Sequence, residues 1–303
     1  MISIVIPAYN EEKTLYHNIH EIMNQIKQID FEIILVDDGS KDNTWNIITS
    51  LAGECSRIKG VKFSRNFGKE AALLAGLEAS SGDAVIPMDS DLQDPPKYIE
   101  TMVAKWQEGY KVVECVSAKR PKESLIYKMC ANIFYKTLEK LTGVDMVNAR
   151  DYRLLDRVVV NEILKLNDAG LFFKGMANWV GFKKTKIMVE TDTRKGDTTK
   201  FNFKSLTKLA LNAITSFSTF PLTIPVKMGI ISFLCGLLLL IVSFFAKNTK
   251  IFANAYLLIG ALELFIGTMI LFSLGVIGLY IGKIYEQTKG RPKYIIEEKC
   301  GKE

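Results

Sequence analysis

The first 40 residues, MISIVIPAYNEEKTLYHNIHEIMNQIKQIDFEIILVDDGS (1–40), decide the fold class. Apolar runs at residues 2–6 and 31–36 are typical of buried strands. Between them, apolar side chains recur from Leu15 to Ile29 at steps of four, three, four and three residues, which indicates an amphipathic helix. This strand, helix and strand together predict two parallel strands of one sheet.

The same alternation continues along the chain. We expect a helix over residues 45–55, a strand over 61–64, a helix over 69–79 and a strand over 84–88. Together these elements predict an α/β fold, with a Rossmann-like, mostly parallel sheet in a domain that spans residues 1–200. An open sheet of this kind binds its ligands at the carboxyl ends of the strands.

Carboxylate-rich segments follow three of these strands. They are PAYNEE at 7–12, VDDGS at 36–40 and DSDLQDPP at 89–96. Asp89 and Asp91 are one residue apart, so in an extended segment both side chains point the same way, with Gln93 next in that direction. Because hard cations prefer oxygen ligands, we expect Mg²⁺ or Mn²⁺ here, holding a diphosphate. An isolated Asp pair also suits a surface turn, so the convergence of three segments carries the argument.

Composition limits the class of protein. The chain has 303 residues, 48% of them hydrophobic and 24% charged, with a net charge of +6. These values exclude a disordered protein, and a mild positive excess without clustering argues against a nucleic-acid partner. The five cysteines, at positions 55, 115, 130, 235 and 300, are odd in number and form no CxxC pair. They exclude a disulfide framework and a zinc ribbon, and they fit a reducing compartment.

Two apolar stretches predict a membrane domain at residues 227–283. Residues 228–246, MGIISFLCGLLLLIVSFFA, carry no charge and can cross the ~30 Å hydrocarbon core as a helix. The stretch 251–282 carries one charge, Glu263, and we place a second transmembrane helix at about 260–282. Glu263 is a functional group inside the membrane, a residue near the outer end of a tilted span, or a contact with a neighbouring subunit. A pair of buried soluble helices is the alternative to the membrane domain.

The charges that flank these stretches predict their orientation. Cations lie mostly outside the pair, at Lys204, Lys208, Lys227, Lys283, Lys289, Arg291 and Lys293, whereas Lys247 and Lys250 lie between the two stretches. The positive-inside rule therefore places the domain 1–200 and a C-terminal tail at 284–303 in the cytoplasm of a multi-pass cell-membrane protein. Residues 201–226 have an amphipathic pattern that fits an interfacial helix or an ordinary surface helix. The N-terminal segment has no signal-peptide pattern.

These motifs resemble those of a known family, glycosyltransferase family 2 with the GT-A fold. Within it the chain is similar to polyprenyl-phosphate glycosyltransferases, such as dolichol-phosphate mannose synthase and the bacterial enzymes that charge undecaprenyl phosphate. The motifs that carry the resemblance are IPAYNEE (6–12), VDDGSKDNT (36–44), FSRNFGKEAAL (63–73), DSDLQDPP (89–96), DYRLLDR (151–157), FFKGMANWVGF (172–182) and LGVIGLYIGKIYEQTKGRPKYII (274–296). They cover nearly the whole chain.

The resemblance implies a donor site for a UDP-sugar. It sets Pro7, Tyr9 and Glu11 against the nucleoside and Asp38 at the base or ribose, although Asp37 and Asp38 also suit a turn before a glycine. Lys69 begins a predicted helix, where a cation and backbone N–H groups suit a diphosphate, and a solvated lysine is the alternative. Asp89, Asp91 and Gln93 form the implied metal and diphosphate site, and Asp89 counts among the nucleotide-binding residues as well.

The implied acceptor is a polyprenyl phosphate, which is already an anionic nucleophile at neutral pH because its second pKa lies near ~6. It needs cations to position it beside an anionic donor, and we assign Arg120, Arg194 and Lys200 to this role. For Arg194 and Lys200 the alternative is a general attraction to anionic lipid, which would not explain the glycine between them. Asp151 matches the family's acceptor-side Asp, where it orients the phosphate, acts as a base or pairs with Arg153. Asp91, Asp151 and Arg120 are thus the predicted catalytic residues.

The sequence departs from the family pattern at two positions. Ser117 and Lys174 stand where relatives commonly carry Arg. At Ser117 one phosphate contact is either missing or supplied by Lys119. No QxxRW motif is present, which argues against a processive polysaccharide synthase. His17 and His20 lie three residues apart on the first helix, where we expect a polar surface rather than metal ligands.

The predicted function is inverting transfer of one hexose, glucose first and N-acetylglucosamine second, from a UDP-sugar to undecaprenyl phosphate. The alternatives are a GDP-mannose-dependent synthase and a non-catalytic nucleotide-binding membrane scaffold. The expected partners are the lipid bilayer, a second copy of the chain, a flippase and a downstream membrane glycosyltransferase. The product would supply a cell-wall polymer or surface glycan.

Overall fold

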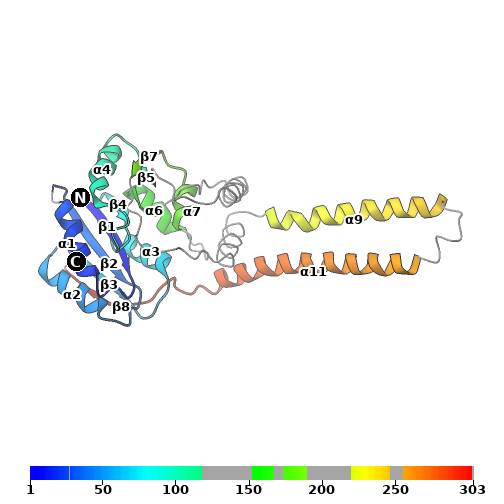
Figure 1. Ribbon diagram of the computed structural model, residues 1–303, viewed down its shortest axis with the longest axis horizontal. Helices are drawn as coiled ribbons and strands as arrows, with labels where there is room; N and C mark the ends of the chain where they lie inside the picture. Colours follow the sequence, from blue (N-terminus) through cyan, green and yellow to red (C-terminus); the bar gives the residue numbers. More distant parts are fainter. Residues whose placement is uncertain (27, 118–151, 167–172, 190–219, 246–254, 302–303) are drawn as a thin grey trace. The chain divides into compact units, whose positions relative to one another are not determined.

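The computed structural model describes residues 1–26, 28–117, 152–166, 173–189, 220–245 and 255–301 (Figure 1). The chain divides into two units. The first comprises Met1–Phe201 together with Pro292–Glu303, and the second comprises Asn202–Arg291. The chain therefore leaves the first unit once and returns to it at its C-terminal end.

A mixed sheet forms the centre of the first unit. In the described part of the chain it has eight strands in the order β7-β5-β6-β4-β1-β2-β3-β8. Their bounds are β1 Ile2–Ala8, β2 Phe31–Asp37, β3 Ile58–Phe63, β4 Ala84–Pro87, β5 Val112–Ser117, β6 Arg153–Asp156, β7 Lys184–Val189 and β8 Ile296–Cys300. Strands β3, β2, β1 and β4 are mutually parallel, with Ile2 opposite Phe31 and Ala84 in the register. The predicted mostly parallel α/β fold is confirmed for these central strands.

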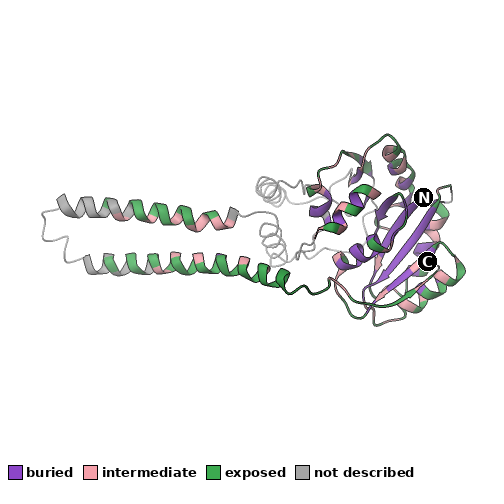
Figure 2. Ribbon diagram, turned by 180° about the vertical axis from the view of Figure 1, so that it is seen from behind, coloured by how far each residue is buried: buried purple, intermediate pink, exposed green. Residues whose placement is uncertain are grey.

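Helices cover both faces of the sheet (Figure 1). One face packs against α1 (Leu15–Gln25), α2 (Thr44–Glu54) and α4 (Ile99–Gln107), which follows the short 3-10 helix η1 (Pro96–Tyr98). The other packs against α3 (Lys69–Ala79), α6 (Arg157–Lys165) and α7 (Phe173–Trp179). Strand β2 shows why: Ile33 and Leu35 join the first core, whereas Ile34 and Val36 join the second. Burial on both faces explains its continuous apolar run (Figure 2).

The flanks of the sheet differ from a purely parallel arrangement. Strand β6 is antiparallel to β4 and β5, and β8 is antiparallel to β3. Strand β8 lies within the segment 284–303, which was predicted to be a C-terminal tail. Its charged composition, IEEKC, hides it from a hydrophobic pattern search, because an edge strand exposes most of its side chains.

The second unit contains two long helices, α9 (Phe220–Phe245) and α11 (Ala255–Thr288), which lie side by side (Figure 1). The predicted spans fall within them, apart from residue 246. Among the residues that the structure describes, one helical stretch, Phe265–Thr288, is long and apolar enough to cross a membrane, and Pro221–Leu234 is a shorter apolar stretch. The predicted interfacial region 201–226 lies outside the described residues except for the start of α9.

Candidate active site

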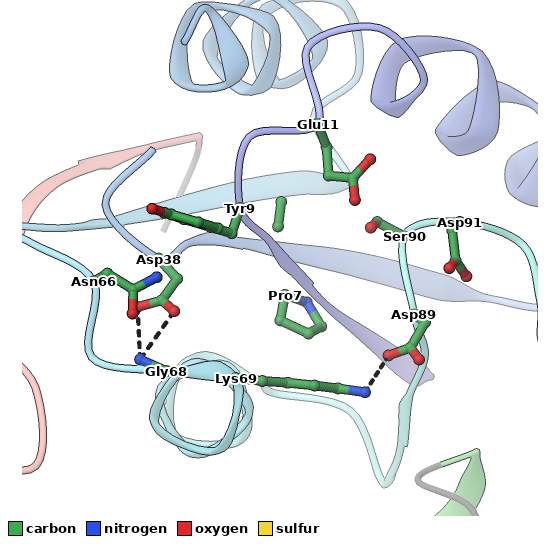
Figure 3. A pocket seen from close by; sticks show the side chains of 11 residues that line it. Pro7, Tyr9, Glu11, Asp38, Asn66, Gly68, Lys69, Asp89, Ser90 and Asp91 are labelled. Carbon is green, nitrogen blue, oxygen red and sulfur yellow. Dashed lines mark hydrogen bonds and ion pairs between the residues drawn. The ribbon is translucent and has the colours of Figure 1, made fainter. Parts of the chain in front are cut away.

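A pocket opens at the carboxyl ends of β1, β2 and β4, beside the start of α3 (Figure 3). Its lining residues are Pro7, Ala8, Tyr9, Glu11, Asp38, Asn66, Gly68, Lys69, Asp89, Ser90 and Asp91. Figure 3 shows Tyr9, Asp38 and Asn66 at one end and Lys69, Asp89 and Asp91 at the other. The three polar segments therefore meet at the edge of the sheet at which the sequence analysis expects them.

The loops after β1 and β2 are joined by hydrogen bonds between side chains and backbone. The Asn10 N–H donates to Oγ of Ser40 at 2.9 Å, and the Lys41 N–H donates to Oδ1 of Asn10 at 2.9 Å. The Glu11 N–H donates to Oγ1 of Thr44 at 2.9 Å. Ser, Thr and Asn side chains are short enough to bond directly to neighbouring backbone groups. This pairing joins the loop that carries Tyr9 and Glu11 to the loop that follows Asp38, and all three residues line the pocket.

Asp38 holds the loop before α3. Its carboxylate accepts from the Phe67 N–H at 2.7 Å and from the Gly68 N–H at 2.9 Å. Burial raises the pKa of this carboxyl, although the two backbone hydrogen bonds oppose the rise. A carboxylate has about four acceptor sites, so Asp38 can accept further donors from a ligand.

Asp37 and Gly39 form the turn beside it. Oδ1 of Asp37 accepts from the Ser40 N–H at 2.9 Å, which confirms the turn-forming alternative for this residue. Gly39 has φ +67°, and a Cβ there would lie 2.3 Å from the backbone carbon of Arg65. Only glycine fits, because both the backbone conformation and the close approach exclude a side chain.

Lys69 faces the pocket. Its ammonium lies 2.6 Å from Oδ1 of Asp89, and the two side chains are 42% and 35% exposed. Lys69 is the first residue of α3, and Asp89 follows β4 by two residues. The ion pair therefore joins the start of a helix to the loop that ends a strand.

The second acidic residue, Asp91, contacts Gln93. The Gln93 side-chain amide donates to Oδ2 of Asp91 at 2.6 Å, and its backbone N–H lies 3.2 Å from Oδ1. Gln93 is exposed and is not among the lining residues of the pocket. Gln93 therefore contacts Asp91 from outside the pocket. Asp89 and Asp91 are the two carboxylates of this loop that line the pocket.

The donor set fits a divalent cation. Within the described ranges, no group of three or more His, Cys, Asp or Glu side chains converges as a metal site. Mg²⁺ needs no such group, because it commonly takes one or two carboxylates together with phosphate oxygens and water. The lining residues carry four carboxylates and one ammonium, so an anionic diphosphate needs a cation to enter. Asp89 and Asp91 are the residues that would hold it.

Several predicted site residues lie outside the described residues. These are Arg120, Asp151, Arg194 and Lys200, together with Lys119. Ser117 ends β5, and Lys174 lies in α7. The buried Arg153 lies with its Nη1 3.7 Å from Oε1 of Glu114. His17 and His20 lie near separate carboxylates, Glu21 and Glu54, as expected for a polar helix surface.

Some residues around the site are not among those predicted from the sequence. Asn66, Gly68 and Ser90 line the pocket within motifs whose other members were assigned. Asn18 and Tyr152 contact the backbone of the acidic loop from behind. Asn18 left a signal in the sequence, because it is a polar residue among the apolar positions that α1 buries.

The fold and the pocket define a doubly wound α/β domain with an acidic, lysine-bearing site at the carboxyl ends of its strands. Residues 3–164 match the family model described as glycosyl transferase family 2. The chain is 40% identical to the SfII prophage-derived bactoprenol glucosyl transferase of Shigella flexneri, over 98% of this chain and 97% of that protein. It is also 40% identical to the uncharacterized glycosyltransferase sll0501 of Synechocystis sp., over 100% of this chain and 96% of that protein.

A solved structure is similar in part. It is glucosyl-3-phosphoglycerate synthase from Mycobacterium tuberculosis in complex with Mn²⁺, UDP-glucose and phosphoglyceric acid, 21% identical over 71% of this chain and 78% of that chain, with a TM-score of 0.49. The match to the family model and the full-length relatives establish the family. The chain belongs to glycosyl transferase family 2, and the resemblance seen in its motifs is confirmed.

Proposed function

We propose that this glycosyltransferase transfers one glucose from UDP-glucose to undecaprenyl phosphate at the cytoplasmic face of the membrane. The observation that carries the proposal is the pocket at the sheet edge that Asp38, Lys69 and Asp89 line together, with the ammonium of Lys69 paired to Asp89. The name of the Shigella flexneri relative, bactoprenol glucosyl transferase, supports glucose and a polyprenyl acceptor. N-acetylglucosamine is the second choice of sugar.

The donor would lie along the pocket. Pro7, Tyr9, Glu11 and Asp38 would contact the uridine, with Tyr9 43% exposed at the mouth of the site. Lys69 and the first turn of α3 would receive the diphosphate. Asp89 and Asp91 would hold Mg²⁺ or Mn²⁺, which would neutralise charge on the departing nucleotide diphosphate.

The acceptor needs positioning more than activation. A phosphate oxygen of the lipid would attack the anomeric carbon from the side opposite the diphosphate, and the bond from that carbon to the diphosphate oxygen would break. One displacement of this kind inverts the anomeric configuration and releases UDP. Arg120, Arg194 and Lys200 would offset the charge of the two anionic substrates, and Asp151 would orient the lipid phosphate. These four assignments rest on the resemblance.

The route of the chain supports two membrane crossings. Residues 1–201, which precede the second unit, and strand β8, which follows it, belong to the same unit, so the chain must return to the side from which it left. If the stretch Phe265–Thr288 crosses once, a second crossing is required, and α9 is the helix available for it. We therefore propose a multi-pass protein with both ends in the cytoplasm, as the positive-inside rule predicts. The second copy of the chain, the flippase and the downstream glycosyltransferase stay predictions.

The test uses the purified full-length protein in detergent with undecaprenyl phosphate. Radiolabelled UDP-glucose, UDP-N-acetylglucosamine, UDP-galactose and GDP-mannose are supplied separately, with Mg²⁺, with Mn²⁺ or with EDTA. We expect label from UDP-glucose in the organic phase, only with metal. Asp91→Asn should lower kcat by about 100-fold or more, because a neutral amide is a weak ligand for a hard cation.

Asp30→Asn is the matched control, because Asp30 is an exposed carboxylate far from the pocket lining. Transfer from GDP-mannose alone would show that the donor is GDP-mannose and not UDP-glucose. Nucleotide binding without transfer from any donor would contradict the proposed transfer reaction and favour the non-catalytic nucleotide-binding scaffold. Orientation is tested separately with alkaline phosphatase, which needs disulfides and is active only outside the cytoplasm. We expect activity when it is fused after Lys250 and none when it is fused after Glu303.

A further inference from the structure

Two buried side chains from outside the acidic loop donate hydrogen bonds to its backbone. The Asn18 amide nitrogen on α1 donates to the carbonyl oxygen of Ser90 at 2.7 Å. The Tyr152 hydroxyl, just before β6, donates to the carbonyl oxygen of Pro95 at 2.9 Å. Asn18 is 8% exposed and Tyr152 is fully buried. Neither is among the residues that line the pocket, so neither would touch a ligand bound there.

The loop needs such support because its backbone is strained. Leu92, between Asp91 and Gln93, has φ +57°, a left-handed conformation that is unfavourable for a non-glycine residue. The Leu92 side chain packs against the hydrophobic core, which opposes this cost locally. Strained backbone persists only where its surroundings hold it, and the two donors act on either side of Leu92.

The residue types indicate that these hydrogen bonds matter. Asn18 shares the buried face of α1 with Leu15, Ile19 and Ile22, where an apolar side chain would pack without any polar cost. Burial raises the pKa of Tyr152, so its hydroxyl keeps its proton and remains a donor. Both donors bind main-chain carbonyls, and Ser90 is the residue between Asp89 and Asp91. A shift of its backbone moves both carboxylates together.

We propose that Asn18 and Tyr152 are positioning residues that hold the 89–95 loop so that Asp89 and Asp91 face one divalent cation. This inference rests on the proposed metal-dependent function. Groups that orient metal ligands from behind typically change metal affinity by 10- to 100-fold when they are removed. Here each donor acts through the backbone, and one lost hydrogen bond corresponds to a change of about fivefold.

The test uses two variants that remove the donor and keep the packing. Tyr152→Phe deletes one hydroxyl. Asn18→Leu is nearly isosteric and continues the apolar positions of α1. The full-length protein in detergent, saturated with UDP, is titrated with Mn²⁺, and free Mn²⁺ is measured by electron paramagnetic resonance. We expect the Kd for Mn²⁺ to rise about fivefold or more in each variant, and kcat to recover at saturating Mn²⁺.

Matched controls separate positioning from folding. Tyr16→Phe removes an exposed hydroxyl, and Asn24→Leu makes the same exchange on the exposed side of α1. Both should keep the Kd for Mn²⁺ of the parent protein. An unchanged Kd in Tyr152→Phe and Asn18→Leu would overturn the inference while leaving the proposed function intact. If one variant fails to fold, the other decides. A parent protein that binds no Mn²⁺ with UDP would overturn the proposed metal dependence, and the inference with it.

Discussion

The ammonium of Lys69 lies 2.6 Å from Oδ1 of Asp89, across the floor of the pocket. This ion pair connects the first residue of α3 with the loop after β4, so it links the start of that helix to one of the three carboxylate-rich segments (Figure 3). In the proposed reaction, each residue of this ion pair would also bind a ligand. The donor diphosphate would bind Lys69, and the divalent cation would bind Asp89, so both ligands act on the same pair of charges.

The charge of Lys69 should be needed for donor binding. Replacing it by Gln leaves four carboxylates in the lining without a protein cation among the described lining residues. A lost charge-assisted hydrogen bond corresponds to roughly 10- to 100-fold in affinity, and we expect the Kd for UDP to rise by that factor. Isothermal titration in the presence of Mg²⁺ measures it. Lys41→Gln is the control, because that exposed lysine lies outside the lining. Equal UDP affinity in both variants would remove Lys69 from the diphosphate site.

Asp38 should organise the loop before α3 as well as contact the nucleoside. In Asp38→Asn, one oxygen of the side chain becomes an amide donor and opposes the Gly68 N–H. We expect the Kd for UDP to rise about tenfold, because the loop that carries Lys69 loses an anchor. The same titration applies, with Asp30→Asn for comparison. A variant that binds UDP as the parent does would show that Asp38 is not needed for the nucleotide.

Glu32 should make the stability of the first unit depend on pH. Burial alone would raise its pKa, but hydrogen bonds from Ser3, Ser81 and Lys59 outweigh burial and lower the pKa to about 2. An ordinary glutamate titrates near 4.5. Because the folded pKa is depressed, this stabilisation is complete above pH 4.5 and is lost as the pH falls towards 2.

The thermal midpoint of the protein in detergent should therefore fall over that pH window. Glu32→Gln should lower the midpoint at pH 7 by roughly 5 °C or more, since breaking a buried charged network costs about 2–3 kcal/mol. It should also flatten the acid dependence. Glu100→Gln, at an exposed position of α4, serves as the control. If the thermal midpoint of Glu32→Gln falls at low pH as it does in the parent protein, other carboxylates are responsible for the loss of stability in acid.

The contact between β3 and β8 should tolerate no side chain at Gly60. A Cβ there would lie 2.5 Å from Sγ of Cys300 and 2.6 Å from Cγ2 of Ile48. Gly60→Ala should cost about 1–3 kcal/mol because the strand pair must shift. Gly53 in α2 has open space around it, so Gly53→Ala should instead stabilise by roughly 0.5 kcal/mol. The thermal midpoints of the two variants should therefore move in opposite directions, and a shift of both in one direction would contradict this packing.

Local patterns predicted the elements of the first unit from β1 to β4. The run at residues 31–36 is almost entirely apolar because β2 is buried on both faces. Such a run can be recognised in the sequence without knowing which elements pack against the strand. The apolar spacing of α1 and the carboxylates after β1, β2 and β4 are equally local. Each polar segment could be assigned to the same sheet edge, because parallel strands end on one side.

Strand β8 could not be predicted in the same way. Its residues IEEKC have no apolar pattern, and the strand exists because β3 offers an unpaired edge and because Trp45 and Lys62 bind Glu298 and Glu297. Those partners are separated by more than 200 residues in the chain. Gln93 differs for another reason. Its partner Asp91 is only two residues away, but an extended segment would point both side chains the same way, whereas in the structure the Gln93 amide donates to Oδ2 of Asp91.

By itself, the sequence determined the alternation of strands and helices, the sheet edge that carries the carboxylates, and the apolar character of the two C-terminal helices. These properties depend on periodicity and composition, which a chain expresses residue by residue. Only the tertiary structure decided that Lys69 pairs with Asp89, that Asp38 binds the backbone of Phe67 and Gly68, and that Asn18 and Tyr152 hold the acidic loop. Each of these contacts joins residues distant in the chain, and its geometry follows from how the sheet and helices pack.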